Sequence, residues 1–415
     1  SASIANVSRN DADNSFGDII SGDTVESENY NVGLQYNIGN SLYSVQSSLM
    51  YNETKTEDHI GESAGYSVSL NGKNGSSARN VFWQLSGSYS DREQDAFNPQ
   101  ATNNDGQHYI VDVQIGAITP WALNPFVRFY DEDVSGTAAG ASLATTSSWG
   151  PGLRWLATQH IIIDLSYNYV ADETVSDDYV AANINWQPSG RTSLVAGYNK
   201  RFFGDSYNFD FQHKTRRLTN KISYTESLEV FDRSNYQEAT SEFWCPSEGF
   251  DGNPDDCFPV NQPPDNQGDY QLIPVSSLVL IENNEYSLNK RLSWSSILQL
   301  SRTSFTLNVA TNNRESLESN IFDDYYDASL SINRKISPRS NLAISGSFRH
   351  SIFDKNNPEG IRQEDYYRTV SGSYSINLAS SLLSSFTLRY IDRDSTEARY
   401  SYDEMRASLH IKKDF

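Results

Sequence analysis

Apolar and polar residues alternate one by one in many segments of the chain. Between residues 30 and 38, the apolar side chains Tyr30, Val32, Leu34, Tyr36 and Ile38 are separated by small or polar residues. The same alternation recurs around residues 66–71, 161–169, 207–212, 305–309, 342–349 and 386–390. A repeat of two residues is typical of β-strands with one apolar and one polar face. The pattern therefore predicts an all-β protein.

The strand-like segments are long, and the connections between them alternate in length. About twenty segments of roughly 10–14 residues can be marked, which is long for strands of globular proteins. Strands of about 9–11 residues are long enough to cross a bilayer at a tilt. Short connections, such as residues 39–41 and 337–339, interleave with long ones, such as residues 11–27, 92–105 and 354–363. Outer-membrane barrels have this arrangement, with short periplasmic turns and long extracellular loops.

We therefore predict a single transmembrane antiparallel β-barrel over residues 1–415, located in the bacterial outer membrane. About 20 strands are expected, with 18 as the close alternative, because both numbers leave an aqueous lumen. The apolar face of each strand would contact lipid, and the polar face would line the lumen. Alternation assigns the following residues to the pore lining: Asn31, Gln35, Ser67, Asn71, Asp164, Asn168, Asp210, Gln212, Asn308, Arg349 and Arg389.

Several aromatic residues lie beside the short turns. Trp121, Trp155, Trp186 and the terminal Phe415 have this position. We interpret them as an aromatic girdle at the membrane interface. The alternative is that tryptophan simply packs well in strands.

The chain is strongly acidic, with a net charge of -21 and a pI of about 4.6. This argues against nucleic acid as a partner, because phosphate binding needs clustered lysine and arginine. Carboxylates gather in the long connections, and basic residues gather near the short turns. We hypothesise that the acidic loops hold divalent cations that bridge lipopolysaccharide phosphates, so outer-membrane lipid and lipopolysaccharide are the expected partners. The alternative is that these carboxylates only solvate exposed loops.

Residues 232–283 form the longest segment without alternation. This segment contains both cysteines of the chain, Cys245 and Cys257. A disulfide between them is predicted, because disulfides persist outside the cytosol. Loops of this length are usually functional or disordered. We predict a lid or an inward-folded constriction, with a floppy external loop as the alternative.

The histidines of the chain give no sign of a catalytic or metal-binding site. None of the six has the spacing of a zinc site, and no His-Glu-x-x-His motif occurs. We therefore expect no enzyme activity, no metal and no cofactor. The longest apolar runs, such as residues 161–163, are too short for a transmembrane helix.

Two stretches of the chain resemble a known family. They are GDSYNFDFQHKTRR at residues 204–217, and NEYSLNKRLSW at residues 284–294 followed by SRTSFTLN at residues 301–308. There the chain is similar to the outer-membrane β-barrel family found beside PEP-CTERM/exosortase and exopolysaccharide gene clusters. That family is in turn similar to biofilm polysaccharide-secretion porins. The resemblance implies export of a polysaccharide cargo together with a periplasmic polysaccharide-export partner.

The expected function is a passive outer-membrane pore for exopolysaccharide, gated by the 232–283 loop. The first alternative is a general or substrate-specific diffusion porin, with a cation preference if acidic groups dominate the constriction. The second alternative is a structural or adhesive surface barrel whose loops bind partners.

Overall fold

The computed structural model describes residues 2–10, 24–56, 62–94, 104–137, 144–171, 177–230, 233–246, 258–259, 270–283, 286–317, 319–356, 362–379, 382–396 and 401–413. Its main body is one antiparallel sheet of 20 strands. This confirms the predicted all-β class and agrees with the expected number of strands. Among the described residues, no helix is long and apolar enough to cross a membrane.

The main sheet follows the order of the chain. Its strands are β1 (Ala2–Asn10), β2 (Thr24–Gly39), β3 (Tyr43–Thr56), β4 (Ser63–Asn74), β5 (Val81–Gln94), β6 (Asn104–Ala117), β7 (Leu123–Ser135), β8 (Ala144–Thr158), β9 (Ile161–Val170), β10 (Tyr179–Ser189), β11 (Thr192–Arg201), β12 (Gly204–Lys214), β13 (Leu218–Val230), β17 (Tyr286–Gln299), β18 (Thr303–Ser316), β19 (Phe322–Ser337), β20 (Ser340–Phe353), β21 (Gln363–Ala379), β22 (Leu382–Ser395) and β23 (Tyr402–Lys413). Each strand pairs with the next, and β13 pairs with β17. Within the described ranges, no ladder joins β23 back to β1.

The ladders are long and continuous. β18 and β19 pair at every position from Thr303 opposite Arg334 to Glu315 opposite Phe322. Continuous pairing suits a membrane, because lipid offers no partner for backbone N–H and C=O groups. Four ladders have a register shift beside a short turn, at Leu156/Thr158, Trp186/Ser189, Lys335/Ser337 and Asn377/Ala379. These four shifts therefore lie at the rim, where water can bind the backbone.

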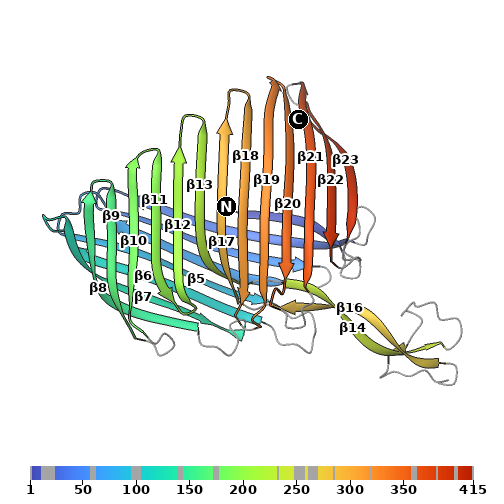
Figure 1. Ribbon diagram of the computed structural model, residues 1–415, viewed down its shortest axis with the longest axis horizontal. Coiled ribbons are helices and arrows are strands. Elements are labelled where there is room, and N and C mark those ends of the chain that lie inside the picture. The colour runs from blue at the N-terminus through green and yellow to red at the C-terminus, as the bar shows by residue number, and fades with distance from the viewer. Residues whose placement is uncertain are drawn as a thin grey trace.

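Figure 1 shows the sheet folded over on itself. The green to red strands, from β9 to β23, stand side by side in front, and the blue to teal strands of the first third of the chain cross behind them. β8 and β9 join the two walls at one side. The faces of the two walls that point toward each other enclose the interior of the protein.

The connections alternate in length as predicted. Short turns such as residues 40–42 and 338–339 interleave with longer connections such as residues 95–103 and 354–362. One connection departs from the pattern, because β11 and β12 are joined only by Phe202 and Phe203 on the side of the long loops. Gly204 ends this tight turn with a φ of 108°, a conformation that side chains with a Cβ rarely adopt.

Residues 233–283 differ from the irregular loop that we expected. β14 (Arg233–Pro246) and β16 (Tyr270–Asn283) pair along their full length, and the short β15 (Phe258–Pro259) pairs with β14. Figure 1 shows this three-stranded arm extending away from the main sheet. The prolines of the segment obscured the strand pattern in the sequence. Its role as a lid or constriction stays a prediction.

Candidate functional site: the polar interior

The burial of side chains is inverted relative to a water-soluble protein. Among the described residues, 8 apolar side chains are buried against 18 polar or charged ones, while 44 large apolar side chains are exposed. On β7, Phe129 is 50% exposed, whereas its neighbours Arg128 and Tyr130 are 6% and 3% exposed. A sheet face that exposes this many large apolar side chains side by side is expected where the surrounding solvent is itself apolar. The apolar face of the sheet is therefore the lipid-facing surface, and the polar face lines the interior.

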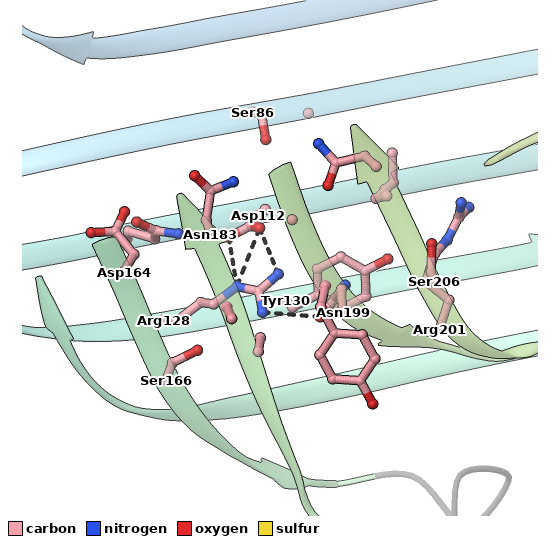
Figure 2. A pocket seen from close by; sticks show the side chains of 18 of the residues that line it. Ser86, Asp112, Arg128, Tyr130, Asp164, Ser166, Asn183, Asn199, Arg201 and Ser206 are labelled. Carbon is pink, nitrogen blue, oxygen red and sulfur yellow. Dashed lines mark hydrogen bonds and ion pairs between the residues drawn. The ribbon is translucent and has the colours of Figure 1, made fainter. Parts of the chain in front are cut away.

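The interior between β4 and β12 contains a cavity of about 510 Å³, named the first cavity here. Figure 2 shows Arg128 at its centre, with Asp112 and Asn199 as its partners. Of the 19 remaining lining residues, 11 carry a hydroxyl or amide group: Ser69, Asn71, Ser86, Ser88, Gln114, Tyr130, Ser166, Asn183, Tyr198, Ser206 and Asn208. These groups both donate and accept hydrogen bonds, so the wall can exchange partners with water or with a polar solute.

Arg128 links the two walls of the sheet. Its Nη2 donates to Oδ2 of Asp112 on the adjacent β6 at 2.7 Å, and its Nε also contacts that carboxylate. Its Nη1 donates to Oδ1 of Asn199 on β11 at 3.0 Å. Because β7 and β11 are not neighbours in the sheet, this last bond spans the interior. The bidentate pair with Asp112 holds the guanidinium plane in the orientation that reaches β11.

Glu132 makes a second connection between β7 and β11. Its fully buried carboxylate accepts a hydrogen bond from Arg201 Nε at 2.9 Å and another from Arg201 Nη2. The hydroxyl of Tyr130 donates to it at 2.7 Å, and Nε2 of His108 lies 3.1 Å away. A buried carboxylate is costly unless it is paired and hydrogen-bonded, and Glu132 meets both conditions. The contacts Arg128–Asn199 and Glu132–Arg201 are named the cross-wall pairs.

Aromatic rings narrow the interior near the short turns. Phe82 and Phe126 are buried and meet edge to face, with ring centroids 6.2 Å apart. The guanidinium carbon of Arg154 lies 4.2 Å from the Phe82 centroid, while its Nε donates to Asp164 at 2.7 Å. A Cβ atom at Gly116 would lie 2.4 Å from the Phe82 ring. The absence of a side chain at this position therefore permits the close packing of the rings.

Apolar side chains bring the walls together at the long-loop end. Val134 on β7 and Tyr286 on β17 form a buried cluster. The side chains packed against them are Phe202, Leu228 and Leu317. The Tyr286 hydroxyl lies 2.8 Å from the position that a Cβ atom of Gly106 on β6 would occupy. Strands from the two walls are therefore in close contact at this end.

A second cavity, of about 710 Å³, lies against β17 to β21. Its charged lining residues are Arg291, Asp327 and Arg349, of which Arg349 donates from Nε to Asp327 Oδ1 at 2.6 Å. The rings of Tyr325 and Tyr367 also line it. This second cavity thus combines exposed guanidinium groups with aromatic surfaces.

Comparison with known proteins gives a likeness in fold alone. No protein-family model matches the chain, and no curated protein matches it. Among solved structures, an OmpT of Vibrio cholerae that lacks loop L8, an outer membrane protein, is 8% identical with a TM-score of 0.32, covering 80% of this chain and 98% of its own. The siderophore receptor PirA of Acinetobacter baumannii is 9% identical, with a TM-score of 0.45. The match covers 94% of this chain and 71% of the receptor chain. The ferric yersiniabactin uptake receptor FyuA of Yersinia pestis is 9% identical, with a TM-score of 0.41. The match covers 99% of this chain and 66% of the receptor chain.

The inverted burial decides the location of the protein. An apolar outer face, a polar inner face, continuous antiparallel ladders and alternating connections together define strands that cross a membrane. The chain is a bacterial outer-membrane β-barrel protein. In such barrels the long loops lie outside the cell and the short turns lie in the periplasm.

The structure places the predicted pore-lining residues on the polar face. Asn71 and Asp164 line the first cavity, Asn308 and Arg349 line the second, and Asn168 is fully buried. The ladder register puts the others on the same face: Asn31, Gln35, Ser67, Asp210, Gln212 and Arg389. Their function in an open pore stays a prediction.

The sequence analysis missed the residues of the cross-wall pairs. Arg128 and Glu132 occupy the polar face of β7, but Phe126 and Tyr130 share that face and obscured the alternation. The available signal was that Arg128 and Glu132 lie four residues apart, which places both charges on the same face of a strand. The contact with Arg201 on a distant strand leaves no periodic trace in the sequence.

The predicted girdle residues have different surroundings. Trp121 and Trp155 are 77% and 48% exposed beside short turns, as interfacial residues would be. Trp186 is half-buried and pairs with Ile161 at the same end. Phe415 lies outside the described residues. The assignment of a girdle stays a prediction.

Tyrosines near the long loops form hydrogen bonds that the sequence analysis did not anticipate. The hydroxyl of Tyr89 donates to Asp91 at 3.0 Å, and the hydroxyl of Tyr224 donates to Glu226 at 2.6 Å. In each pair the carboxylate lies two residues closer to the long-loop end. A ring followed by a charged group suits the boundary between lipid and headgroups.

The acidic long-loop end contains paired charges. Lys355, outside the strands, donates to Oδ2 of Asp324 at 2.6 Å, and this hydrogen bond raises the pKa of Lys355. Within the described ranges, no three His, Cys, Asp or Glu side chains gather as metal ligands. Cation binding by the acidic loops and contact with lipopolysaccharide stay predictions.

The predicted disulfide lies partly outside the described residues. Cys245 is in β14, opposite Gln271 of β16. Cys257 belongs to a segment that the structure does not describe. The bridge therefore stays a prediction.

Proposed function

We propose that the protein is an outer-membrane channel that exports an exopolysaccharide passively. The observation that supports this proposal is the lining of the first cavity, where serine, asparagine and glutamine side chains outnumber charged ones. Such a wall offers many weak, exchangeable hydrogen bonds to the hydroxyl groups of a sugar chain. Conduction requires binding that is weak and repeated along the path, and this lining suits that requirement.

The arginines of the first cavity are compatible with passage of a neutral polymer. Arg128 and Arg201, the arginines that line the cavity, are paired with Asp112 and Glu132, and the lining carboxylate Asp164 is paired with Arg154. Their charges are therefore compensated locally and do not trap a passing hydroxyl group. Because the opposite charges cancel locally, these pairs make the interior polar without creating a large net electric field. Transport along this path needs no chemical step, so we propose no enzymatic activity.

The cargo and the partner in this proposal come from the family resemblance. A polysaccharide-export protein in the periplasm would deliver the chain to the short-turn rim. Basic residues gather on that rim, including Lys73, Arg191 and Lys214. Gating by residues 232–283, the lid or constriction predicted from the sequence, is not part of this proposal and stays a prediction of its own.

Single-channel recording in planar bilayers tests the channel. We expect stepwise conductance from the purified protein, with interruption of the current when a neutral oligosaccharide is added on the short-turn side. Addition of dithiothreitol tests whether Cys245 and Cys257 influence gating. A conducting protein that no oligosaccharide interrupts would be a diffusion porin. A protein that never conducts would contradict the channel and favour a structural or adhesive surface barrel.

A further inference from the structure

The two cavities differ in their balance of charge. In the first cavity, Arg128 is paired with Asp112, and Arg201 is paired with Glu132. The second cavity has two arginines, Arg291 and Arg349, but only one carboxylate among its described lining residues. This excess of positive charge is unexpected in a chain with a net charge of -21.

A third arginine lies on the same wall. Arg389 on β22 pairs with Ser371 on β21, whose Oγ lies 2.7 Å from Oγ of Ser345 on β20. Ser345 is two residues before Ser347, which lines the second cavity, so both point to the same face. Arg389 therefore continues the basic wall of the second cavity toward the short turns.

The three guanidinium groups are open to solvent and weakly compensated. Arg291 and Arg389 are exposed, and neither forms an ion pair with a carboxylate in the part of the chain that the structure describes. The side chain of Arg349 is 58% exposed although it contacts Asp327. Because exposed ion pairs are weak, an incoming anion can compete for Arg349.

Aromatic surfaces lie beside these charges. The rings of Tyr325 and Phe353 meet edge to face, with centroids 6.0 Å apart, and both line the second cavity. Tyr367 presents a third ring to the same space. An aromatic face can pack against the apolar face of a sugar ring while a neighbouring arginine binds a charged substituent. Arginine suits this task because its planar donors match carboxylate and phosphate geometry.

We propose that the second cavity binds anionic substituents of a polysaccharide through Arg291, Arg349 and Arg389. The ligand class is a sugar chain that carries carboxylate, sulfate or phosphate groups. This inference rests on the proposed channel function and adds the sign of the cargo's charge. It also gives the channel a preference for anions, opposite to the cation preference of the porin alternative.

The test measures ion selectivity in planar bilayers with a gradient of KCl. We expect the unmodified protein to prefer chloride over potassium. The triple variant Arg291→Gln, Arg349→Gln, Arg389→Gln should lower the chloride-to-potassium permeability ratio by about tenfold, because a charged wall concentrates counter-ions. The matched control is Arg368→Gln, since Arg368 is equally exposed but pairs with Asp392 on the lipid-facing side of the same region. Heat-dependent migration in SDS gels confirms that each variant is folded.

A second readout separates this inference from the channel proposal. Oligogalacturonate and a neutral malto-oligosaccharide of equal length are added as blockers. Stronger block by oligogalacturonate that disappears in the triple variant supports the anion site. Equal block by both compounds, or a triple variant with unchanged selectivity, overturns the anion site and leaves the channel intact. Chloride preference that depends on the arginines, without block by either compound, supports the anion site and overturns polysaccharide transport.

Discussion

Glu132 shows how a charge is kept inside this protein. Its carboxylate is fully buried, and its donors come from β6, β7 and β11. Arg201, the main partner, has a side chain that is only 10% exposed. Both charges are largely removed from bulk water, so each depends on the other for much of its stabilisation.

We expect Glu132→Ala to reduce the free energy of unfolding by about 3–5 kcal/mol, because it leaves the Arg201 charge buried without a partner. Urea titration of the protein in lipid vesicles, followed by tryptophan fluorescence, measures this loss. The matched control is Asp210→Asn, which removes the partner of the exposed Lys221. This control should cost less than about 1 kcal/mol. Equal losses in the two variants would show that Glu132 is not effectively buried.

Single residues also show the limit of prediction from the sequence. Asp164 was assigned to the polar face because it alternates with Ile163 and Leu165, and the structure places it in the first cavity. Arg201 was not assigned, although it contacts the same cavity. Its strand, β11, carries apolar residues such as Val195 on the polar face, so the alternation is weak there.

At the scale of the strand, the two faces of each strand have different surroundings, with lipid on one side and the polar interior on the other. On β21, Val370 is 57% exposed on the lipid-facing side, whereas Thr369 lines the second cavity. The two residues are adjacent in sequence and lie near the middle of the strand. Substitutions at these two positions therefore compare the lipid-facing and the lumen-facing environment at the same depth in the membrane.

Val370→Arg should reduce the free energy of unfolding by about 2–4 kcal/mol, the cost of arginine facing lipid near the bilayer midplane. Thr369→Arg should cost less than half as much, since its side chain enters a hydrated cavity. Folding titrations in vesicles of defined lipid compare the two. If Thr369→Arg is the more harmful variant, the assignment of inner and outer faces on β21 is wrong.

The arm formed by β14, β15 and β16 is independent of the main ladder. β13 pairs with β17 from Leu218 opposite Leu298 to Val230 opposite Tyr286, without help from the arm. Figure 1 shows the arm extending away from the sheet.

Replacement of residues 233–283 by a short glycine-serine linker should preserve assembly and leave the conductance unchanged. The reason is that the β13–β17 ladder remains complete in this variant. Migration in SDS gels before and after heating reports assembly, and planar bilayers report conductance. A clear rise in conductance would instead support the lid or constriction predicted from the sequence.

At the scale of the whole molecule, the cross-wall pairs connect the two walls of the sheet through the interior. Contacts between neighbouring strands stabilise each wall, but Arg128–Asn199 and Glu132–Arg201 connect β7 with β11 through the interior. The apolar contact of Val134 with Tyr286 adds to this closure at the long-loop end. A wider path for cargo requires that these contacts open.

The double variant Glu132→Gln, Arg201→Gln should fold and should conduct more than the unmodified protein. Removing both charges together avoids an unpaired buried ion while it weakens the link between the walls. Single-channel recordings measure the change. The control is Arg154→Gln with Asp164→Gln, because this ion pair joins the neighbouring strands β8 and β9 and does not span the interior. Equal conductance changes in both double variants would contradict a specific role of the cross-wall pairs.

The sequence by itself determined the class of the fold and the two faces of its strands. A period of two residues can be read locally, because each side chain's face depends only on its neighbours along the strand. The alternating connection lengths likewise predicted the membrane-spanning sheet. Only the tertiary structure decided which polar residues meet across the interior, because Glu132 and Arg201 are 69 positions apart. It also decided that positive charge gathers in the second cavity, since Arg291 on β17 and Arg349 on β20 line the same space. Such contacts depend on how the whole sheet curves, and no local pattern encodes that curvature.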